Sequence, residues 1–508
     1  MKLSLSFLLL ISSLANAELL NSGYAVEKSS TCAGFPRVSI SSPQGSCVGL
    51  VVDKGEGLKM PRRIVEYREN EFYITDMGSW AKNNGTLWKL VIEENGYKNL
   101  TKVLTKLDRP HGLQIGPDGR IYIGEAGRIS SIDPTANENI ERKDFIVNLP
   151  VEGSHPLTHF IFTSQNSVLV NIGAPTDQCL TESGKPIYPC EQYKNEAQVR
   201  EYLLDDKGNV TGEFVVQGRG LRNSMALAEN LFGDFFQGEN SMDFKELHEP
   251  KEEINLLGNG KHFGWPYCYE KDSLNPKFKK SLFNRKMPKI DCSDYEAPVA
   301  FLPSHSAPLD MFFYRGEALS FFKNKLVVSL HGYRETGHRL VAFDLDENER
   351  PVGEAKEIIN GWEAKVGVRP RGAPVGMSEG SDGKLWFVED KNGTVMVVAP
   401  SLQDDVTTDN NSGQVEYSDL AIGKYEALQK GFFTKNCTSC HQIFEGDSEA
   451  SIKNLIDSGL VKPRMANSSE LYLRILGQGE GRPMPPGANH LLSDEDKELV
   501  KDWINSIR

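Results

Sequence analysis

Gly116-Pro117-Asp118-Gly119-Arg120-Ile121-Tyr122-Ile123 is the stretch that decides the fold, because it joins a tight polar turn to a short apolar strand. The turn residues favour a chain reversal, and the aliphatic and aromatic residues that follow suit a half-buried strand. The same pattern recurs at Asp382-Gly383 before Lys384–Val388 and at Lys323-Asn324 before Lys325–Val328, with similar strands at Phe72–Thr75 and Ser167–Asn171. Such repeats, with few helix-period segments, predict an all-β six-bladed β-propeller with loop insertions. A large two-sheet sandwich is the alternative, although it leaves more strand edges unpaired at this length.

The chain is 508 residues long. This length exceeds that of one small domain and predicts at least two domains. The polar stretch Ser401–Asp419 lacks periodicity and is typical of a linker. It separates a predicted propeller domain at residues 18–400 from a predicted small all-α domain at residues 420–508.

The N-terminus has the pattern of a secretion signal. Lys2 precedes an apolar stretch, Leu3–Leu14, and the small-residue sequence Ala15-Asn16-Ala17 follows. We expect residues 1–17 to be a signal peptide that is cleaved before Glu18, because the apolar stretch is too short for a membrane span. The expected location is therefore periplasmic or secreted, without a transmembrane anchor.

Near the C-terminus, Cys437-Thr438-Ser439-Cys440-His441 has the spacing that attaches a c-type haem. Cys437 and Cys440 would form thioethers to the porphyrin, and His441 would bind the iron. A zinc half-site would need a second ligand pair, and a thioredoxin-like redox pair would not need the histidine. The predicted all-α domain is therefore a cytochrome c domain, which makes the protein an electron-transfer protein.

A sixth iron ligand is expected downstream, on a rigid loop. Met484 lies between two prolines in Arg482–Gly487 and is the predicted haem iron ligand, with Met465 as the rival. After Ser493, an acidic first turn predicts a capped helix. Its apolar stripe is predicted to cover the haem and comprises Leu499, Val500, Trp503, Ile504 and Ile507.

The cysteines and the charge agree with an exported electron-transfer protein. Six of the eight cysteines remain after the haem pair. They fall as near neighbours, which favours Cys32–Cys47, Cys179–Cys190 and Cys268–Cys292 disulfides, although six cysteines allow fifteen pairings. A net charge of −13 argues against nucleic acid and anionic membranes as partners. An acidic surface suits a basic redox partner.

A propeller tethered to a cytochrome needs a redox cofactor of its own. No Gly-x-Gly-x-x-Gly sequence appears, which argues against NAD or a flavin on a Rossmann domain. Several separate motifs instead resemble the soluble pyrroloquinoline quinone (PQQ)-dependent sugar dehydrogenases, particularly their sorbosone and pyranose dehydrogenase branch. The motifs span most of residues 60–400 and are Arg109–Leu113, Leu221–Asn223, Gly238–Asp243, Phe263–Cys268 and Val368–Pro374.

The resemblance implies a six-bladed propeller with PQQ and Ca²⁺ over its central channel. PQQ carries three carboxylates, which paired arginines hold with forked donors, and Arg369 and Arg371 match that clamp. An outward-facing strand pair is the alternative for these two residues. The resemblance also places Arg109, His111 and Asn223 among the residues that bind the quinone.

The resemblance implies that His155 is the base that takes the proton of the sugar hydroxyl, with His159 as the rival. Arg222 would support catalysis by stabilising negative charge on the quinone, and a salt bridge in a propeller loop is its alternative. Where the family often has Gly-Asp after the following strand, this chain has Gly173-Ala174, which puts that cofactor or channel contact in doubt.

Calcium is expected because a hard cation would polarise the reactive carbonyl of the quinone. The family uses backbone carbonyls as protein ligands, which correspond here to Ser241 and Met242. The sequence thus predicts a periplasmic quinohaemoprotein that oxidises an aldose or sorbosone-like sugar by hydride transfer to PQQ. Electrons would pass to haem c and then to an external acceptor, a cytochrome or terminal oxidase chain. The alternatives are a non-catalytic sugar- or protein-binding propeller with a relay cytochrome, and a lactonase-like hydrolytic propeller.

Overall fold

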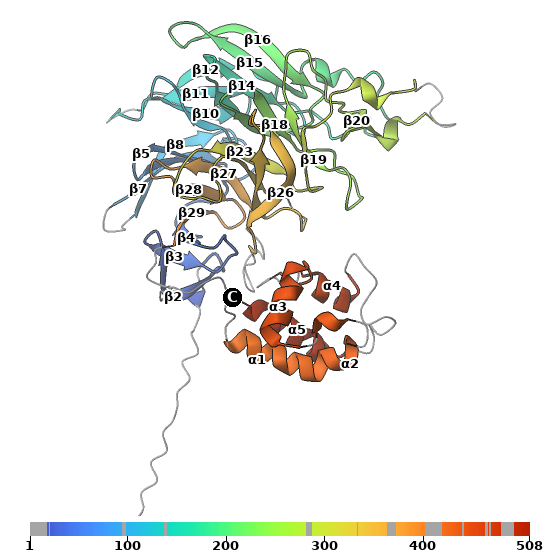
Figure 1. Ribbon diagram of the computed structural model, residues 1–508. Helices are drawn as coiled ribbons and strands as arrows, with labels where there is room; N and C mark the ends of the chain where they lie inside the picture. Colours follow the sequence, from blue (N-terminus) through green and yellow to red (C-terminus); the bar gives the residue numbers. More distant parts are fainter. Residues whose placement is uncertain are drawn as a thin grey trace, which may run out of the picture. The chain divides into compact units, whose positions relative to one another are not determined.

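The chain forms two compact units, Met1–Leu402 and Gln403–Arg508. A computed structural model describes residues 18–19, 21–93, 98–136, 140–280, 287–332, 334–362, 372–401, 419–438, 441–444, 446–462, 466, 469–478 and 492–507. Figure 1 shows the first unit as β-sheets coloured from blue to orange and the second as helices coloured from orange to red. Within these ranges, no helix combines the length and the apolar character that a membrane crossing requires.

Five four-stranded antiparallel sheets make up most of the first unit. The first two are β5 Pro61–Arg68, β6 Glu71–Asp76, β7 Gly85–Ile92 and β8 Lys98–Leu107, then β9 Leu113–Ile115, β10 Ile121–Glu125, β11 Arg128–Ile132 and β12 Lys143–Val147. The next two are β13 Phe160–Phe162, β14 Ser167–Ile172, β15 Gln198–Leu204 and β16 Val210–Arg219, then β17 Ser224–Glu229, β18 Phe235–Glu239, β19 Glu252–Leu256 and β22 Ala300–Leu302. The fifth is β23 Pro308–Tyr314, β24 Lys325–Leu330, β25 Arg339–Leu345 and β26 Pro351–Ile359.

A seven-stranded sheet joins the two ends of this unit. β27 Pro374–Glu379, β28 Leu385–Glu389 and β29 Thr394–Pro400 are followed in the sheet by β4 Ser46–Val52, β3 Phe35–Val38, β2 Ala25–Cys32 and β1 Glu18–Leu19. β4 pairs antiparallel with β29, from Val395 opposite Val52 to Pro400 opposite Ser46. A small hairpin of β20 Cys268–Tyr269 and β21 Ser273–Leu274 belongs to an insertion between β19 and β22.

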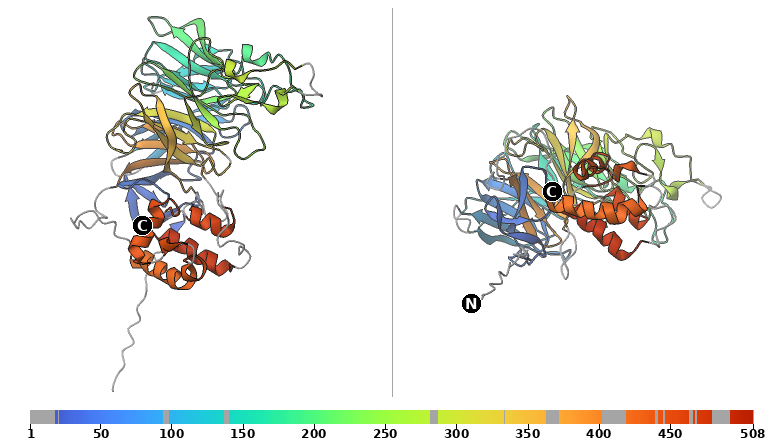
Figure 2. Two further views of the ribbon diagram at one scale, coloured as in Figure 1. Left: turned by 45° about the vertical axis from the view of Figure 1, so that its right-hand side comes forward. Right: turned by 60° about the horizontal axis from the view of Figure 1, so that its bottom comes forward.

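The sheets follow one another around a ring, and Figure 2 shows them from two further sides. The first strands β5, β9, β13, β17, β23 and β27 contact one another in this order, and β27 contacts β5. This closed arrangement confirms the predicted β-propeller, and the sandwich alternative is wrong. Five sheets are four-stranded blades, whereas β27–β29 belong to the seven-stranded sheet, so the count of six blades stays a prediction.

Alternating side chains hold neighbouring sheets together, because successive residues of a strand point to opposite faces. In β28, Trp386 and Val388 pack in one hydrophobic core with Phe72 of the β5–β8 sheet. Leu385 and Phe387 face the other way, into a core shared with the β23–β26 sheet. A strand buried on both faces explains the nearly continuous apolar run of β28.

The three predicted disulfides are confirmed. Cys32–Cys47 joins β2 to β4, Cys179–Cys190 closes a loop between β14 and β15, and Cys268–Cys292 closes the insertion after β19. Each disulfide links cysteines that are near neighbours in the sequence, which is why their spacing alone predicted the three pairs.

The second unit is a small helical region. Its helices are α1 Asp419–Leu428, a π-helical turn Gln429–Phe433, α2 Thr434–Asn436, a 3-10 turn Gln442–Phe444, α3 Ser448–Asp457, α4 Glu470–Leu476 and α5 Asp494–Ser506. Tyr425, Phe433 and Trp503 form an aromatic centre in its core. The predicted small helical region is confirmed, and its identity as a cytochrome c stays a prediction.

The last helix has the predicted cap but a narrower apolar face. Ser493 and Asp496 form a reciprocal capping box before α5. Val500, Trp503, Ile504 and Ile507 are buried, as predicted, whereas Leu499 is 51% exposed. Its predicted place beside a haem stays a prediction. Positions 500, 503, 504 and 507 share one face, and position 499 lies about 100° around the helix from position 500.

Candidate active site

A cavity of about 670 Å³ opens in the propeller and is lined by residues from several blades. Arg62 comes from β5, His155 from the segment before β13, and Arg222 and Asn223 from the segment before β17. Other lining residues are Met60, Trp80, Asp177, Asn240, Ser241, Asp243, Glu252, His305, His331, Arg334, Asp390 and Lys391. The propeller thus brings together residues that lie more than three hundred positions apart in the chain, such as Arg62 and Asp390.

His155 is held in one tautomer by a backbone carbonyl. Its Nδ1 lies 2.6 Å from the oxygen of Ala174, and because a carbonyl can only accept, Nδ1 carries the proton and Nε2 a lone pair. No described residue bonds to Nε2. Burial and the nearby Arg222 cation lower the pKa of His155 to about 4. The imidazole is therefore neutral at neutral pH and suited to accept a proton.

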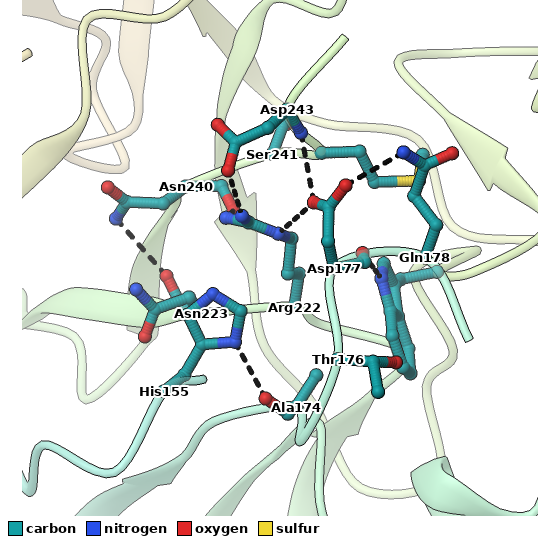
Figure 3. A network of polar contacts seen from close by, with 12 residues as sticks. His155, Ala174, Thr176, Asp177, Gln178, Arg222, Asn223, Asn240, Ser241 and Asp243 are labelled. Carbon is teal, nitrogen blue, oxygen red and sulfur yellow. Dashed lines mark hydrogen bonds and ion pairs between the residues drawn. The ribbon is translucent and has the colours of Figure 1, made fainter. Parts of the chain in front are cut away.

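Arg222 is the centre of a polar network (Figure 3). Its Nε donates to Asp177 Oδ1 at 2.8 Å, its Nη1 to the Asn240 carbonyl at 3.0 Å and its Nη2 to Asp243 Oδ2 at 2.7 Å. The Asp243 backbone N–H also donates to Asp177 Oδ1, at 2.9 Å. The Asp177 carbonyl accepts from Trp265 Nε1 at 2.8 Å. Two segments, one with Asp177 and one with Asn240 and Asp243, thus fix one buried guanidinium at the cavity wall. The salt bridge of the alternative interpretation is present, and the catalytic role of Arg222 stays a prediction.

The adjacent Asn223 has an unused acceptor. Its backbone carbonyl accepts from Asn240 Nδ2 at 3.2 Å, while its side-chain Oδ1 is buried without a partner among the described residues. Because buried polar atoms are normally hydrogen-bonded, this atom fits a ligand that donates a hydrogen bond in the cavity. The buried Glu239 carboxyl holds this segment in place, because it accepts hydrogen bonds from the backbone N–H groups of Arg222 and Asn223. Burial raises the pKa of Glu239 to about 7.

A second network joins three residues from different sheets, Arg62, His331 and Asp390, which are called the hub residues below. Arg62 donates from Nε to His111 Nδ1 at 3.1 Å and from Nη1 to Asp390 Oδ2 at 2.5 Å. Asp390 Oδ1 lies 2.9 Å from His331 Nε2. Although burial favours its neutral form, His331 and Arg62 hold the pKa of Asp390 at about 2. Arg62, His331 and Asp390 line the cavity, so a charged network forms part of its wall.

His159, the rival to His155, is held away from the cavity. It is fully buried, its Nε2 lies 3.0 Å from Arg63 Nη2, and it does not line the cavity. His111 is likewise buried beside Arg62 and does not line the cavity. Arg109 pairs with its neighbour Asp108 at 2.7 Å and is also not brought to the cavity. Of the predicted site residues, the cavity therefore collects His155, Arg222, Asn223 and Ser241.

The expected calcium ligands lie beside the Arg222 network. The Ser241 backbone N–H donates to Glu252 Oε2 at 2.5 Å, and its hydroxyl donates to the Lys251 carbonyl at 2.9 Å. The Met242 carbonyl accepts from the Phe244 N–H at 3.0 Å. Within the described ranges, no group of three or more His, Cys, Asp or Glu side chains could hold a metal ion. A calcium site built from backbone carbonyls stays a prediction.

Several predicted site residues lie outside the described residues: Arg369, Arg371, Cys440, Met465 and Met484. In the helical unit, Cys437 is buried and forms no disulfide, and burial raises its pKa to about 11. His441 is exposed, and its backbone N–H donates to the Cys437 carbonyl at 3.0 Å.

Sequence reasoning missed Asp177, Arg62, His331 and Asp390. Asp177 lies three residues after Ala174 and two before Cys179, so the short disulfide loop was the one available signal. The three hub residues belong to no local pattern, because their partners come from other blades.

The chain is similar to other proteins in sequence and in fold. The sequence profile of the TrAA12-like family matches residues 44–401. An uncharacterized protein of Borreliella burgdorferi is 24% identical over 355 residues, which are 66% of this chain and 84% of that protein. The pyrroloquinoline quinone-dependent pyranose dehydrogenase of Coprinopsis cinerea is 24% identical over 344 residues, 59% of this chain. The chain spans only 44% of the length of that relative.

Among solved structures, the iodide structure of Trichoderma reesei Carbohydrate-Active Enzymes Family AA12 has a TM-score of 0.57 at 20% identity. The alignment spans 71% of this chain and 98% of the Trichoderma reesei chain. At this identity the likeness concerns the fold, which is the propeller described above.

Proposed function

The chain belongs to the TrAA12-like family, and on that premise we propose that its propeller oxidises a sugar with PQQ as the hydride acceptor. The substrate class is an aldose or sorbosone-like sugar. The electrons pass to a haem c bound in the helical unit and then to an external acceptor, a cytochrome or terminal oxidase chain. The similarity to a PQQ-dependent pyranose dehydrogenase supports this proposal.

The observation that carries the proposal is the neutral imidazole of His155 in the cavity. The carbonyl of Ala174 fixes its Nδ1–H, so Nε2 is the proton acceptor. In the proposed reaction, Nε2 takes the proton of the sugar hydroxyl as the C–H bond gives up its hydride. Arg222, held in place by Asp177 and Asp243, would present N–H donors beside the site where negative charge develops.

The chemistry of the residues that line the cavity supports PQQ as the cofactor. PQQ would supply a planar quinone that accepts a hydride, and its three carboxylates need cationic partners. Arg222, Arg62 and Lys391 line the cavity, and the unpartnered Oδ1 of Asn223 can accept from a sugar hydroxyl. We propose that Arg369 and Arg371 complete the carboxylate clamp, and that the carbonyls of Ser241 and Met242 bind Ca²⁺.

The haem proposal depends on the sequence Cys437–His441. A c-type haem would supply a one-electron acceptor held by Cys437 and Cys440, with His441 and Met484 on the iron. The free, buried thiol of Cys437 beside an aromatic core fits this attachment. Covalent haem attachment and three disulfides also suit an exported protein, so we propose a periplasmic or secreted location.

The test is reconstitution of the full-length protein with PQQ and Ca²⁺. Aldopyranoses, sorbosone and lactones would then be supplied, and reduction of a dye and of the haem would be followed by absorbance. Sugar-dependent dye reduction that requires PQQ is the expected result. The matched variant His155→Gln should bind PQQ and lose about 10²–10⁴-fold in rate.

Other outcomes would reject parts of the proposal. Sugar binding without oxidation would make the protein a binding propeller, and lactone hydrolysis without an acceptor would make it a hydrolase. Dye reduction without haem reduction would reject the route to haem.

A further inference from the structure

The cavity carries one aromatic feature that the chemistry above does not use. Trp80 lines the cavity and is 54% exposed. Among the described lining residues it is the single Trp, Tyr or Phe. No hydrogen bond or ring contact of its side chain is present in the described residues. A large indole is therefore displayed at the cavity.

The loop that displays Trp80 is built to hold its shape. Asp76 Oδ1 accepts from the Met60 N–H at 2.8 Å and from the Gly78 N–H at 2.9 Å. Ser79 Oγ accepts from Asn84 Nδ2 at 2.8 Å, which closes the loop across its base. Gly78 has φ +66°, and a side chain there would collide with the Asn84 carbonyl. These contacts hold the backbone that carries Trp80 before any ligand arrives, which reduces the entropy cost of ordering the loop on binding.

A pyranose ring is the ligand that suits an exposed indole beside a polar site. Its equatorial hydroxyls point outward and leave axial C–H groups that form an apolar face. Such polarised C–H groups are attracted to the negative face of an aromatic ring, and their burial adds a hydrophobic gain. The hydroxyl edge can meanwhile bond polar groups of the cavity such as His155 and Asn223. Small-molecule sites commonly combine an aromatic wall with a few polar groups in this way.

Trp80 suits the sugar better than the quinone. A tricarboxylate is held by charge-assisted hydrogen bonds, which the face of a neutral indole cannot make. Trp80 is neutral and open to solvent. A residue that contacts the substrate is expected to be accessible in this way, because the substrate must enter and leave in every turnover.

We propose that Trp80 is a specificity-determining residue that stacks against the apolar face of an aldopyranose and so favours ring-closed sugars over acyclic ones. This inference rests on the proposed function and names the substrate class of the same cavity.

The experiment compares Trp80→Ala, Trp80→Phe and wild type in the full-length protein reconstituted with PQQ and Ca²⁺. Glucopyranose and the acyclic glyceraldehyde would be supplied, with dye reduction as readout. For glucopyranose, Trp80→Ala should raise KM about tenfold with kcat within about twofold, and Trp80→Phe should retain most of the affinity. For glyceraldehyde, KM should not change. The control is Phe232→Ala, because Phe232 is 63% exposed and does not line the cavity.

An unchanged KM for glucopyranose, or an equal rise for glyceraldehyde, would overturn the inference. Weaker PQQ binding by Trp80→Ala with an unchanged sugar KM would also overturn it, because the indole would then contact the quinone. A fluorescence titration of quinone-free protein with glucose separates this inference from the proposed function. Saturable quenching in wild type that is lost in Trp80→Phe supports stacking even if no sugar is oxidised, whereas equal quenching in both proteins rejects it.

Discussion

The protonation of His155 gives the sharpest test of the active site. Burial and Arg222 lower its pKa from 6.5 to about 4. At about pH 5, such an imidazole is about 90% neutral, whereas one with an ordinary pKa would be about 3% neutral. A group with a lowered pKa stays deprotonated as the pH falls through 6.5, so the base should remain competent at pH 5.

The measurement is a nitrogen NMR titration of histidine-labelled, quinone-free protein from pH 5 to pH 8. The His155 signal, assigned by its loss in His155→Gln, should show a neutral Nδ1–H tautomer throughout. Removal of the cation in Arg222→Gln should raise the pKa of His155, so that a larger fraction of its signal is protonated at pH 5 than in wild type. The control variant His248→Gln removes an exposed histidine and should leave the His155 signal unchanged. A His155 midpoint near 6.5, or an Nε2–H tautomer, would refute the role of the Ala174 carbonyl and of burial.

The remaining predictions concern the ligands of the two cofactors and the partner of Arg222. Asp177→Asn removes the carboxylate that accepts from Arg222 Nε at 2.8 Å and should lower kcat about tenfold, because an ion pair becomes a weaker hydrogen bond from a charged donor to a neutral acceptor; an unchanged kcat in steady-state assays would contradict this role. Arg369→Ala with Arg371→Ala should weaken PQQ binding at least about tenfold in a titration of quinone-free protein, and equal affinity would exclude the clamp. Met484→Ala should leave haem covalently bound while lowering its reduction potential, as measured by redox titration; an unaltered spectrum and potential would assign the sixth position to another residue.

The propeller could be predicted from local sequence because each strand carries its own signal. In β10, Ile121, Tyr122 and Ile123 follow a turn of Pro117, Asp118 and Gly119, and both the turn and the strand are present in the structure. The pairing of β4 with β29 could not be predicted in this way. It joins strands that are more than three hundred residues apart, and its register depends on the closure of the whole ring.

The active site could be predicted only where a motif kept neighbouring residues together. Arg222 and Asn223 are adjacent, so a short sequence match identified both. Asp177 acts through a contact with Arg222, forty-five positions later, which the three-dimensional arrangement of two loops creates. The hub residues Arg62 and Asp390 are an extreme case, because each is ordinary in its own segment and acquires its charge partner only when the ring closes.

Gly173-Ala174 shows how a backbone atom can perform a task that side-chain identity does not reveal. The absence of an aspartate after Gly173 put a contact in doubt, yet the Ala174 carbonyl binds His155 Nδ1 at 2.6 Å. The carbonyl fixes the same tautomer that a carboxylate would fix, but it brings no negative charge to stabilise the imidazolium. With Arg222 as the nearby cation, the protonated form of His155 is disfavoured. A base that is oriented by a neutral acceptor binds a proton less strongly than one oriented by a carboxylate. It also stays neutral, and so able to accept a proton, at mildly acidic pH.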